Sequence, residues 1–380
     1  PRSRHLRRFA QSPNLPVILA PQFASRLIIW DCLNPHAAPL YEIQMTTFLG
    51  LGVSLSNENP VNETVALAQT ADELGFDEVS IPESRLFGSV TSTAAVVLSR
   101  TNRIIVRIGI ANPVTRHPLV LALEAATLAD IGPGRIRFGI GAAEWTMKDL
   151  GVEPIGWRPY TNTIESLRAM RSLLAGQPLG FSPTTFRASA EVKIDRPAPE
   201  TVPIDVGAVS TRMLQAAGSH ADGVQLGAIT SVGYARWAAG RIEQGAVSAG
   251  RNPADLLLSA NVLTSVDPDR QIARQAVREV LAYYLARVEG VVVEESGADV
   301  NDINQVRQAV TNGGVAAGAL LVSDNLIDTF SVAGTPNDVV EGLAAYADVG
   351  LQMPLIWYTF GPDPMDALHT IAREIRPALC

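Results

Sequence analysis

The feature that most constrains the fold of this 380-residue chain is a pattern that occurs eight times, a short apolar run followed by an amphipathic segment. The runs are continuously apolar, which is typical of parallel strands that are buried on both faces. Eight such units predict a (β/α)8 TIM barrel. An open doubly wound sheet is the weaker alternative, because the chain has no switch-point fingerprint. The predicted strands cover residues 48–54, 78–82, 103–111, 135–141, 202–208, 222–228, 256–266 and 353–361.

Two insertions interrupt this pattern, residues 177–202 after strand four and residues 289–335 after strand seven. The first contains the strand-like segments FRAS and EVKI. The second contains GGVAAG, which we interpret as a mobile loop. Both insertions should lie near the catalytic face of the barrel. Residues 1–44 show no sustained periodicity, so we expect an N-terminal extension outside the core, followed by a barrel domain of residues 45–380.

Composition excludes several classes of protein. Hydrophobic residues make up 47% and charged residues 18% of the chain, which allows a large buried core. The net charge of -8 lacks the basic character of a nucleic-acid binder. The two cysteines, Cys32 and Cys380, form no disulfide framework or zinc motif, and no apolar stretch reaches the roughly 18 residues of a membrane span. We therefore expect a cytoplasmic protein that binds neither nucleic acid, membrane nor metal.

The stretch GRIRFGIGAAEWTMKDLG, residues 134–151, looks at first like a dinucleotide site because Gly139 and Gly141 follow an apolar run. The dinucleotide fingerprint needs a small residue three positions after its second glycine, and Glu144 stands there. The nucleotide interpretation therefore fails. What remains is a strand that ends in glycines and places a carboxylate at its C-terminal tip.

The residues that follow the predicted strands define the mouth of the barrel, where the chemistry of this fold gathers. They include several glycines, several hydroxyl groups and the carboxylates of Glu83 and Glu144. A metal-ligand cluster, a probable nucleophilic cysteine and a GxSxG motif are all missing from this set. Such a mouth suits a large planar cofactor with polar contacts better than it suits hydrolysis.

Four motifs in chain order resemble those of the bacterial luciferase-like superfamily. They are NPVTRHP after the third strand, GRIRFGIGAAEWTMKDLG at the fourth, IDVGAVSTRMLQAAGSHADGVQLGA across the fifth and sixth, and AGTPNDVVEGLAAYADVG before the eighth. The resemblance runs from about Met45 to Pro377. Within the superfamily the chain is most similar to the branch that uses the deazaflavin coenzyme F420, such as methylenetetrahydromethanopterin reductases and F420-dependent glucose-6-phosphate dehydrogenases.

The resemblance implies a bulge at the end of the third strand, with a non-prolyl cis peptide at Gly109–Ile110 against the deazaflavin ring. It gives Glu144 an acid/base role and places Glu83 at the tip of the second strand, as a second catalytic carboxylate and cofactor contact. The other implied cofactor contacts are Ala111 and Asn112 after the bulge, Ala142, Ala143 and Met147 after strand four, and Ala208, Val209, Thr211 and Arg212 after strand five, where amides at a helix start would meet phosphate.

The chain departs from the family pattern at two positions. Where family members often carry a histidine as proton donor at the tip of the second strand, this chain has Ser84, which cannot act as an acid near neutral pH. Where the reductase branch carries a glutamate in the first strand, this chain has Gly52. The identity of the substrate is therefore open.

Structural roles compete with the catalytic ones. Glu144 suits the first turn of a helix, where the helix dipole stabilises a carboxylate. Glu83 can form an ion pair with Arg85 or Arg116. Packing or capping is the default role of the remaining candidates, His117 and the aromatic residues Trp357, Tyr358 and Phe360.

From these observations we predict an F420-dependent oxidoreductase that moves a hydride between the deazaflavin and a small organic substrate, and that works as a homodimer. The first alternative is an FMN-dependent monooxygenase of the same superfamily. The two differ at ring position 5, where the nitrogen of a flavin can activate oxygen and the carbon of the deazaflavin favours hydride transfer. The second alternative is a non-catalytic flavin-binding barrel.

Overall fold

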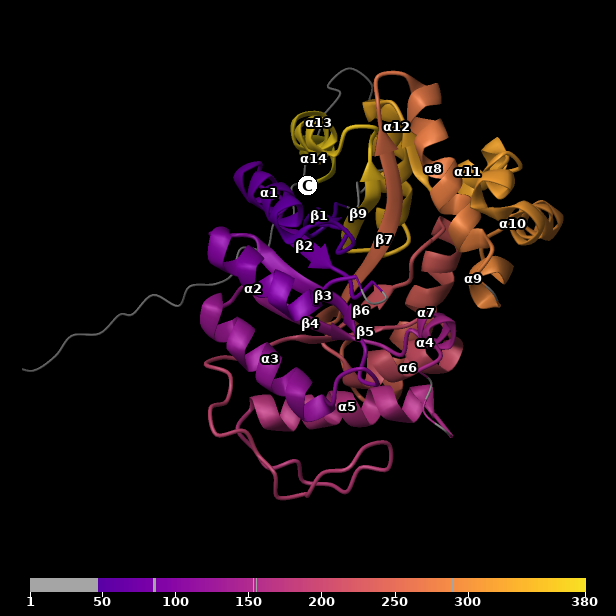
Figure 1. Cartoon of the computed structure of the whole chain (residues 1–380). Helices are drawn as coiled ribbons and strands as arrows, with labels where there is room; N and C mark the ends of the chain where they lie inside the picture. Colours follow the sequence, from indigo (N-terminus) through magenta and orange to yellow (C-terminus); the bar gives the residue numbers. More distant parts are fainter. Residues whose placement is uncertain (1–46, 85–86, 153, 155, 289) are drawn as a thin grey trace, which may run out of the picture. The chain divides into compact units, whose positions relative to one another are not determined.

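The computed structural model describes residues 47–84, 87–152, 154, 156–288 and 290–380. The predicted extension of residues 1–44 therefore lies outside the described residues. Eight parallel strands form a closed ring, because β9 pairs with β1 and β6 pairs with β7. This confirms the predicted (β/α)8 barrel (Figure 1). The ring consists of β1 Gly52–Ser54, β2 Glu78–Ile81, β3 Ile105–Ala111, β4 Ile136–Ile140, β5 Ile204–Gly207, β6 Gly223–Leu226, β7 Leu257–Val266 and β9 Met353–Phe360.

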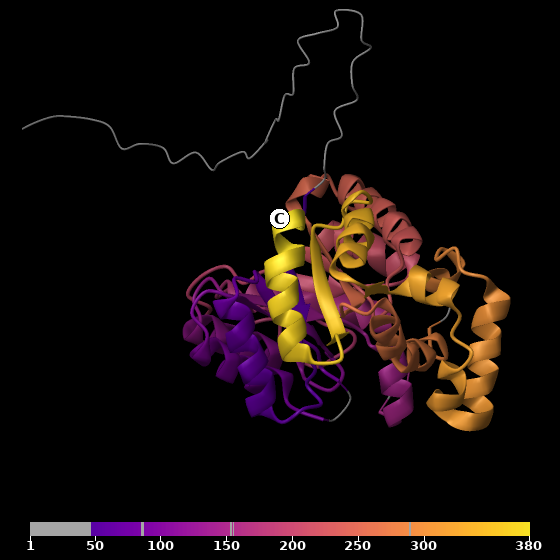
Figure 2. The same ribbon diagram turned by 90° about the horizontal axis from the view of Figure 1, so that it is seen from above.

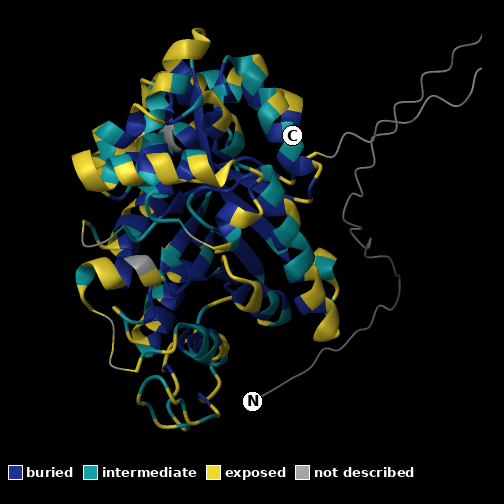
Figure 3. Ribbon diagram, turned by 90° about the vertical axis from the view of Figure 1, so that its right-hand side faces the viewer, coloured by how far each residue is buried: buried dark blue, intermediate teal, exposed yellow. Residues whose placement is uncertain are grey.

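Helices surround the strands, and their buried faces form the main apolar core with the outward-facing strand residues (Figure 3). Their N-termini are capped as the sequence allows, for example by Ser231 at α7 and by a capping box of Thr335 and Asp338 at α12. The helices of this layer are α1 Val61–Glu73, α2 Val90–Arg100, α3 Pro118–Ile131, α5 Pro159–Leu174, α6 Thr211–His220, α7 Val232–Ser248, α12 Pro336–Ala347 and the C-terminal run α13 Pro364–Thr370, Ile371–Ile375 and α14 Arg376–Leu379.

The inside of the barrel is polar at the level of Arg107, whose side chain is fully buried. Arg107 forms ion pairs with Glu78 and Asp205, and Asp205 also accepts a 2.6 Å hydrogen bond from Arg137. Burial alone would lower the pKa of Arg107, but the two carboxylates outweigh it and hold that pKa above its usual range. The four charged side chains thus compensate one another across β2, β3, β4 and β5.

The first insertion, residues 177–202, contains no strand, so the prediction of strands at FRAS and EVKI is wrong. The backbone hydrogen bonds here are isolated. Leu179 donates to Val192 and Gly180 to Ala190, each at 2.9 Å, and Val192 donates to Ser189 at 3.2 Å. The tip of the loop reaches the N-terminal end of α3, where the ring of His117 contacts the carbonyl of Arg187 at 3.2 Å. Polar contacts to the neighbouring helices replace sheet pairing here.

The second insertion, residues 289–335, is helical, and the expectation of a mobile loop at GGVAAG is wrong. That segment lies in α10 and kinks at Gly314, where φ is +79°. The insertion packs with α8 Arg270–Leu285 around a second apolar cluster that includes Leu281 and Phe330 (Figure 2). Its elements are α9 Val291–Glu294, α10 Val300–Ala319, α11 Asp324–Phe330 and β8 Val332–Gly334.

Most buried residues of α8 belong to this second cluster and not to the main core. In the outer layer of helices, α12 follows β7 and precedes β9, and its residues Val339, Leu343 and Tyr346 belong to the main core. From Thr264 onward, strand β7 pairs with β8 as well as with β9, and α8 begins after this pairing. The order of elements was predicted correctly, but the helix that completes the barrel was not the expected one.

Across the described ranges, no helix is both long and apolar enough to cross a membrane.

Candidate active site

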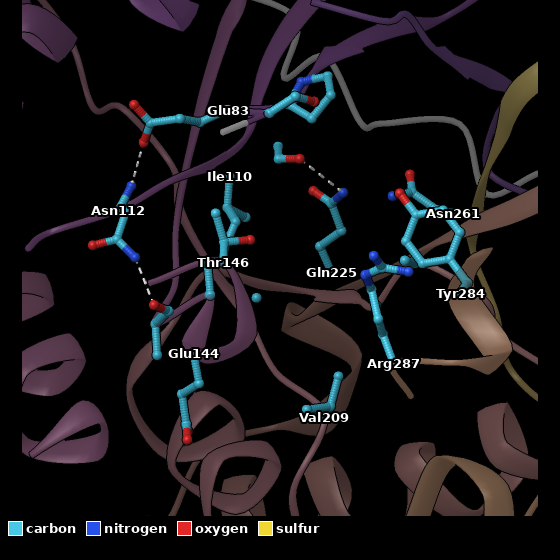
Figure 4. A pocket seen from close by; sticks show the side chains of 18 of the residues that line it. Glu83, Ile110, Asn112, Glu144, Thr146, Val209, Gln225, Asn261, Tyr284 and Arg287 are labelled. Carbon is cyan, nitrogen blue, oxygen red and sulfur yellow. Dashed lines mark hydrogen bonds between the residues drawn. The ribbon is translucent and has the colours of Figure 1, made fainter. Parts of the chain in front are cut away.

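A cavity of ≈ 660 Å³ opens at the carboxyl ends of the strands (Figure 4). Each of the eight barrel strands contributes residues to its lining, from or just after the strand, and α4 Glu144–Leu150 and the end of α8 supply further walls. In barrels of this kind the carboxyl ends of the strands carry the chemistry, so this cavity is the candidate active site.

The bulge expected at the end of β3 is present. The pairing of β3 with β4 shifts between Ile108 and Ala111, and the Gly109–Ile110 peptide bond is cis. The side chain of Ile110 lies against three glycines, because a Cβ atom on Gly139 or Gly207 would come within 2.9 or 2.8 Å of it and one on Gly141 would collide with its Cδ1. Gly139 and Gly141, in and directly after β4, therefore leave the space that the bulge needs. This packing explains the nucleotide-like glycine pattern in the sequence.

Gly109 itself faces the polar interior. A Cβ atom there would collide with the hydroxyl of Ser80 and would lie 2.8 Å from the side-chain oxygen of Gln225. Both of these oxygen atoms are buried and lack a hydrogen-bond partner among the described residues. Gln225 contributes only one long contact, of 3.5 Å, from its amide nitrogen to the carbonyl of Gly109. The floor of the cavity thus holds polar groups with unused hydrogen-bonding capacity.

Glu83 is tied to the segment that follows the bulge. One of its carboxylate oxygens accepts a 2.8 Å hydrogen bond from the backbone amide of Asn112, and the other forms an ion pair with Arg116. Asn112 in turn donates to the carbonyl of Ala142 at 2.5 Å. Of the two predicted ion-pair partners, Arg116 makes the contact and Arg85 lies outside the described residues. Glu83 therefore connects β2, β3 and β4 while lining the cavity.

Glu144 begins α4, directly after Ala143, which adopts the left-handed conformation at φ 46°. It lines the cavity, but its side chain is exposed and extends away from Ile110 (Figure 4). The carboxylate of Glu144 is therefore not buried in the cavity. In the same short helix at the rim, Thr146 and Met147 are buried, so α4 turns Glu144 towards solvent and these two residues inward.

The other expected cofactor contacts divide into two groups. Those in the cavity wall are Gly109, Ile110, Asn112, Ala142, Ala143, Met147, Ala208 and Val209. Three lie elsewhere. Ala111 is buried in the main core, and Thr211 and Arg212 are exposed outside the cavity. The guanidinium of Arg212 instead stacks on the ring of Tyr160, with its central carbon 3.8 Å from the ring centroid. The side chains of Thr211 and Arg212 therefore do not line the cavity.

The remaining sequence expectations can also be placed. The ring nitrogen Nδ1 of His117 accepts a 3.2 Å hydrogen bond from Leu119 and caps α3, as expected. Phe360 packs in the main core, and the side chain of Tyr358 is outside the described residues. Trp357 both packs in the second cluster and lines the cavity. Ser84 lines the cavity as well.

The packing around Gly52 explains why this chain lacks the glutamate that the reductase branch carries at this position. A Cβ atom at this position would lie 2.6 Å from the side chain of Leu355 and 3.1 Å from the carbonyl of Glu78. A glutamate therefore has no room here without repacking of β9.

One wall of the cavity was missed by the sequence reasoning. It is formed by the end of α8 and by inward-pointing strand residues, namely Gln225, Asn261, Tyr283, Tyr284 and Arg287, and it adjoins Trp357. The rings of Tyr284 and Trp357 meet edge to face, with centroids 5.0 Å apart. A signal for part of this wall was available, since polar residues alternate with apolar ones in the sixth and seventh strands. Nothing in the pattern of α8 indicated that its last turn reaches the cavity.

Comparisons with known proteins agree with this geometry. The family model described as luciferase-like monooxygenase matches residues 42–353. A 5,10-methylenetetrahydromethanopterin reductase of Methanolobus tindarius is 31% identical over 327 residues, which is 85% of this chain and 98% of the relative. An F420-dependent glucose-6-phosphate dehydrogenase of Nakamurella multipartita is 29% identical over 343 residues, covering 84% and 92%.

Among solved structures, the coenzyme F420 dependent tetrahydromethanopterin reductase from Methanopyrus kandleri superposes with a TM-score of 0.81 at 26% identity, covering 87% of this chain and 99% of that one. An FMN complex of a Baeyer-Villiger monooxygenase from Pseudomonas putida shares the fold, with a TM-score of 0.64 at 17% identity over 87% and 98% of the two chains. The named relatives at higher identity are oxidoreductases, which marks this protein as an enzyme. The chain belongs to the luciferase-like monooxygenase family.

Proposed function

We propose that this protein is an F420-dependent oxidoreductase that transfers a hydride between C5 of the deazaflavin and a small organic substrate. The observation that carries the proposal is the cavity wall at Ile110, whose side chain fits against Gly139, Gly141 and Gly207. It is supported by the 29% identity of this chain to an F420-dependent glucose-6-phosphate dehydrogenase and by the 26% identity to the coenzyme F420 dependent tetrahydromethanopterin reductase. The FMN-binding neighbour shares only 17% identity, which supports the fold alone.

The residues of the cavity fit a deazaflavin. Ile110, Ala142 and Met213 supply apolar surface for a flat ring. The side-chain oxygens of Gln225 and Asn261 are buried without a partner among the described residues, and the polar edge of such a ring would satisfy them. We assign the tail of the coenzyme to the loops after β4 and β5, which present Ala143, Met147, Ala208 and Val209 to the cavity.

When bound, the coenzyme supplies or accepts the hydride at C5 of its ring. The protein's part is to position the substrate, to exclude water and to move one proton. We assign the proton to Glu144, since it lines the cavity and makes no ion pair among the described residues. We assign a positioning role to Glu83, because the ion pair with Arg116 and the hydrogen bond from the Asn112 amide fix the orientation of its carboxylate.

Oxygen consumption distinguishes this proposal from the monooxygenase alternative. Reduced F420 and the protein are mixed in air with carbonyl, imine and activated-alkene compounds, while the deazaflavin absorbance and the dissolved oxygen are followed together. We expect oxidation of the coenzyme that depends on one substrate class and consumes no oxygen. Formation of an oxygenated product from one of these compounds with reduced FMN, oxygen and the protein, without turnover of F420, would contradict the proposal.

A further inference from the structure

Arg287 follows the last turn of α8 and lines the active-site cavity. In Figure 4 it lies beside Tyr284 and Asn261, on the opposite side of the cavity from Glu83 and Glu144. It comes from the part of the chain after β7 and not from the loops after β4 and β5. The positive charge of Arg287 therefore lies on a cavity wall other than the one formed by the loops to which we assign the coenzyme's tail.

The guanidinium of Arg287 is held in a fixed orientation. Its central carbon lies 3.7 Å from the centroid of the Tyr283 ring, and Nη1 donates a 2.8 Å hydrogen bond to the carbonyl of Tyr283. These contacts use one face of the group and one of its nitrogens. Nε and Nη2 donate no hydrogen bond to other described residues, so their N–H groups can bind a ligand.

Arg287 has no carboxylate partner in the described part of the chain, although it is only partly exposed. Other arginines of the barrel that are shielded from solvent do have one, for example Arg107 with Glu78 and Arg116 with Glu83. A shielded cation without a counter-charge is unfavourable, so an anion at this position would stabilise it.

We infer that Arg287 is an oxyanion-binding group and that the substrate carries a carboxylate or a phosphate. A guanidinium whose plane is fixed by stacking can offer two parallel N–H donors to such a group, which makes the interaction directional as well as electrostatic. The substrate would then be oriented by its charged end at α8, with its reacting carbon toward Ile110. This inference rests on the proposed function for the identity of the ligand as substrate, but the anion site itself can be tested without the coenzyme.

The test measures anion binding by isothermal titration of the purified full-length protein, with and without F420, using sodium phosphate and sodium acetate as probes. We expect saturable binding of at least one probe to the wild type, and a loss of about tenfold or more in Arg287→Gln. Arg287→Lys keeps the charge without the fork and should fall between the two. Arg274→Gln is the matched control, because Arg274 lies on the same helix and pairs with Asp324 and Asp328 away from the cavity. It should bind the probes as the wild type does.

A second measurement separates the substrate from the coenzyme's own anionic tail. The affinities of F420 and of the tailless deazaflavin are determined by fluorescence titration for the wild type and for Arg287→Gln. Equal affinities in the two proteins support the inference. It is overturned if the variant loses affinity for F420 but not for the tailless ring, if neither probe binds the wild type, or if Arg287→Gln binds the probes unchanged. Failure of F420 to bind the wild type, with anion binding still dependent on Arg287, refutes the proposed function and supports the anion site.

Discussion

The side chain of Ile110 lies in the space that a Cβ atom on Gly141 would need, and its Cδ1 atom would be the nearest contact of such an atom. The bulge of β3 therefore requires a residue without a side chain at Gly141, directly after β4. The backbone carbonyl oxygen of Gly207 would lie 3.2 Å from the same Cβ atom, so a methyl group on Gly141 would be crowded from two sides. The wall of the active site depends on this pair of residues from neighbouring strands.

The first prediction concerns this pair. Gly141→Ala should force Ile110 out of its slot, lowering F420 affinity about tenfold, or about 1.4 kcal/mol, and the free energy of unfolding by about 1–3 kcal/mol. Both are measured by titration with F420 and by denaturant unfolding. Gly240→Ala in α7 is the control, because a Cβ there meets nothing within 4 Å and alanine favours a helix. An unchanged F420 affinity in Gly141→Ala would show that Ile110 does not form the ring's wall.

Glu144 is the subject of the second prediction. Hydride transfer to a carbonyl, imine or activated alkene leaves an anion that must be protonated. Glu144→Gln should keep F420 affinity within about threefold and should lower turnover roughly 10²-fold, the usual scale for loss of a general acid. Steady-state kinetics with the substrate class found above measure this change. If turnover survives, the proton comes from water or from Glu83, and Glu144 serves only the first turn of α4.

The third prediction is a pH dependence in the first insertion. Glu165 accepts hydrogen bonds from Thr184 and Thr185, including two hydroxyl contacts of 2.7 Å. Burial raises the pKa of Glu165, but these hydrogen bonds outweigh it and lower the pKa below its usual value of 4.5. Because the folded-state pKa is the lower one, the stabilisation is present above pH 4.5 and is lost as the pH falls through the folded-state pKa.

Hydrogen exchange of the amides of Thr184 and Thr185 measures this effect. We expect faster exchange below that pH in the wild type, after correction for the intrinsic rate. Glu165→Gln should show the faster exchange at neutral pH and should be cut sooner by trypsin at Arg187 within the loop. Equal protection of these amides in the two proteins would show that other contacts hold the loop.

A fourth prediction concerns self-association. The outward face of α3 exposes Val120, Leu123 and Ile131, at 43%, 49% and 40%, and Val96 on the adjacent α2 adds to this surface. We propose that a second copy of the chain covers it, since a helix that is apolar on all sides is normally buried. Light scattering should give about twice the chain mass of 40.5 kDa.

Leu123→Glu should shift that mass to the monomer, because it places charges in an apolar contact. Val247→Glu on α7 is the matched control, since Val247 is 61% exposed outside this surface. A wild-type monomer, or a dimer that Leu123→Glu leaves intact, would rule out this face as the interface.

The barrel could be predicted because its strands are marked by outward-facing apolar residues, such as Val106 and Ile108 in β3, which pack under the helices. The same reading overlooked the inward positions. Arg107 and Asp205 interrupt two of the predicted strands, yet their burial depends on one another, and this compensation between distant strands is visible only after the ring closes. The charged interior is therefore a property of the fold that no single run of sequence displays.

The site shows a similar limit. Residues next to the strand ends, such as Ile110 and Ala142, could be placed from the motifs, because the chain there goes directly from strand to cavity. Arg287 could not, since it follows α8, and the amphipathic pattern of a helix does not show which side of the barrel its end reaches. Thr211 and Arg212 were expected to contact the cofactor, but their side chains are exposed. The start of α6 was predicted correctly, whereas the direction of these side chains was not.

The central claim is that the cavity beside Ile110 binds a deazaflavin, and a direct comparison of F420 with FMN tests it. Both are titrated into the purified protein in the dark, and binding is followed by the fluorescence of each coenzyme. We predict a micromolar or tighter dissociation constant for F420 and an affinity for FMN about 100-fold weaker, a difference of about 2.7 kcal/mol. Tighter binding of FMN than of F420 would contradict the account.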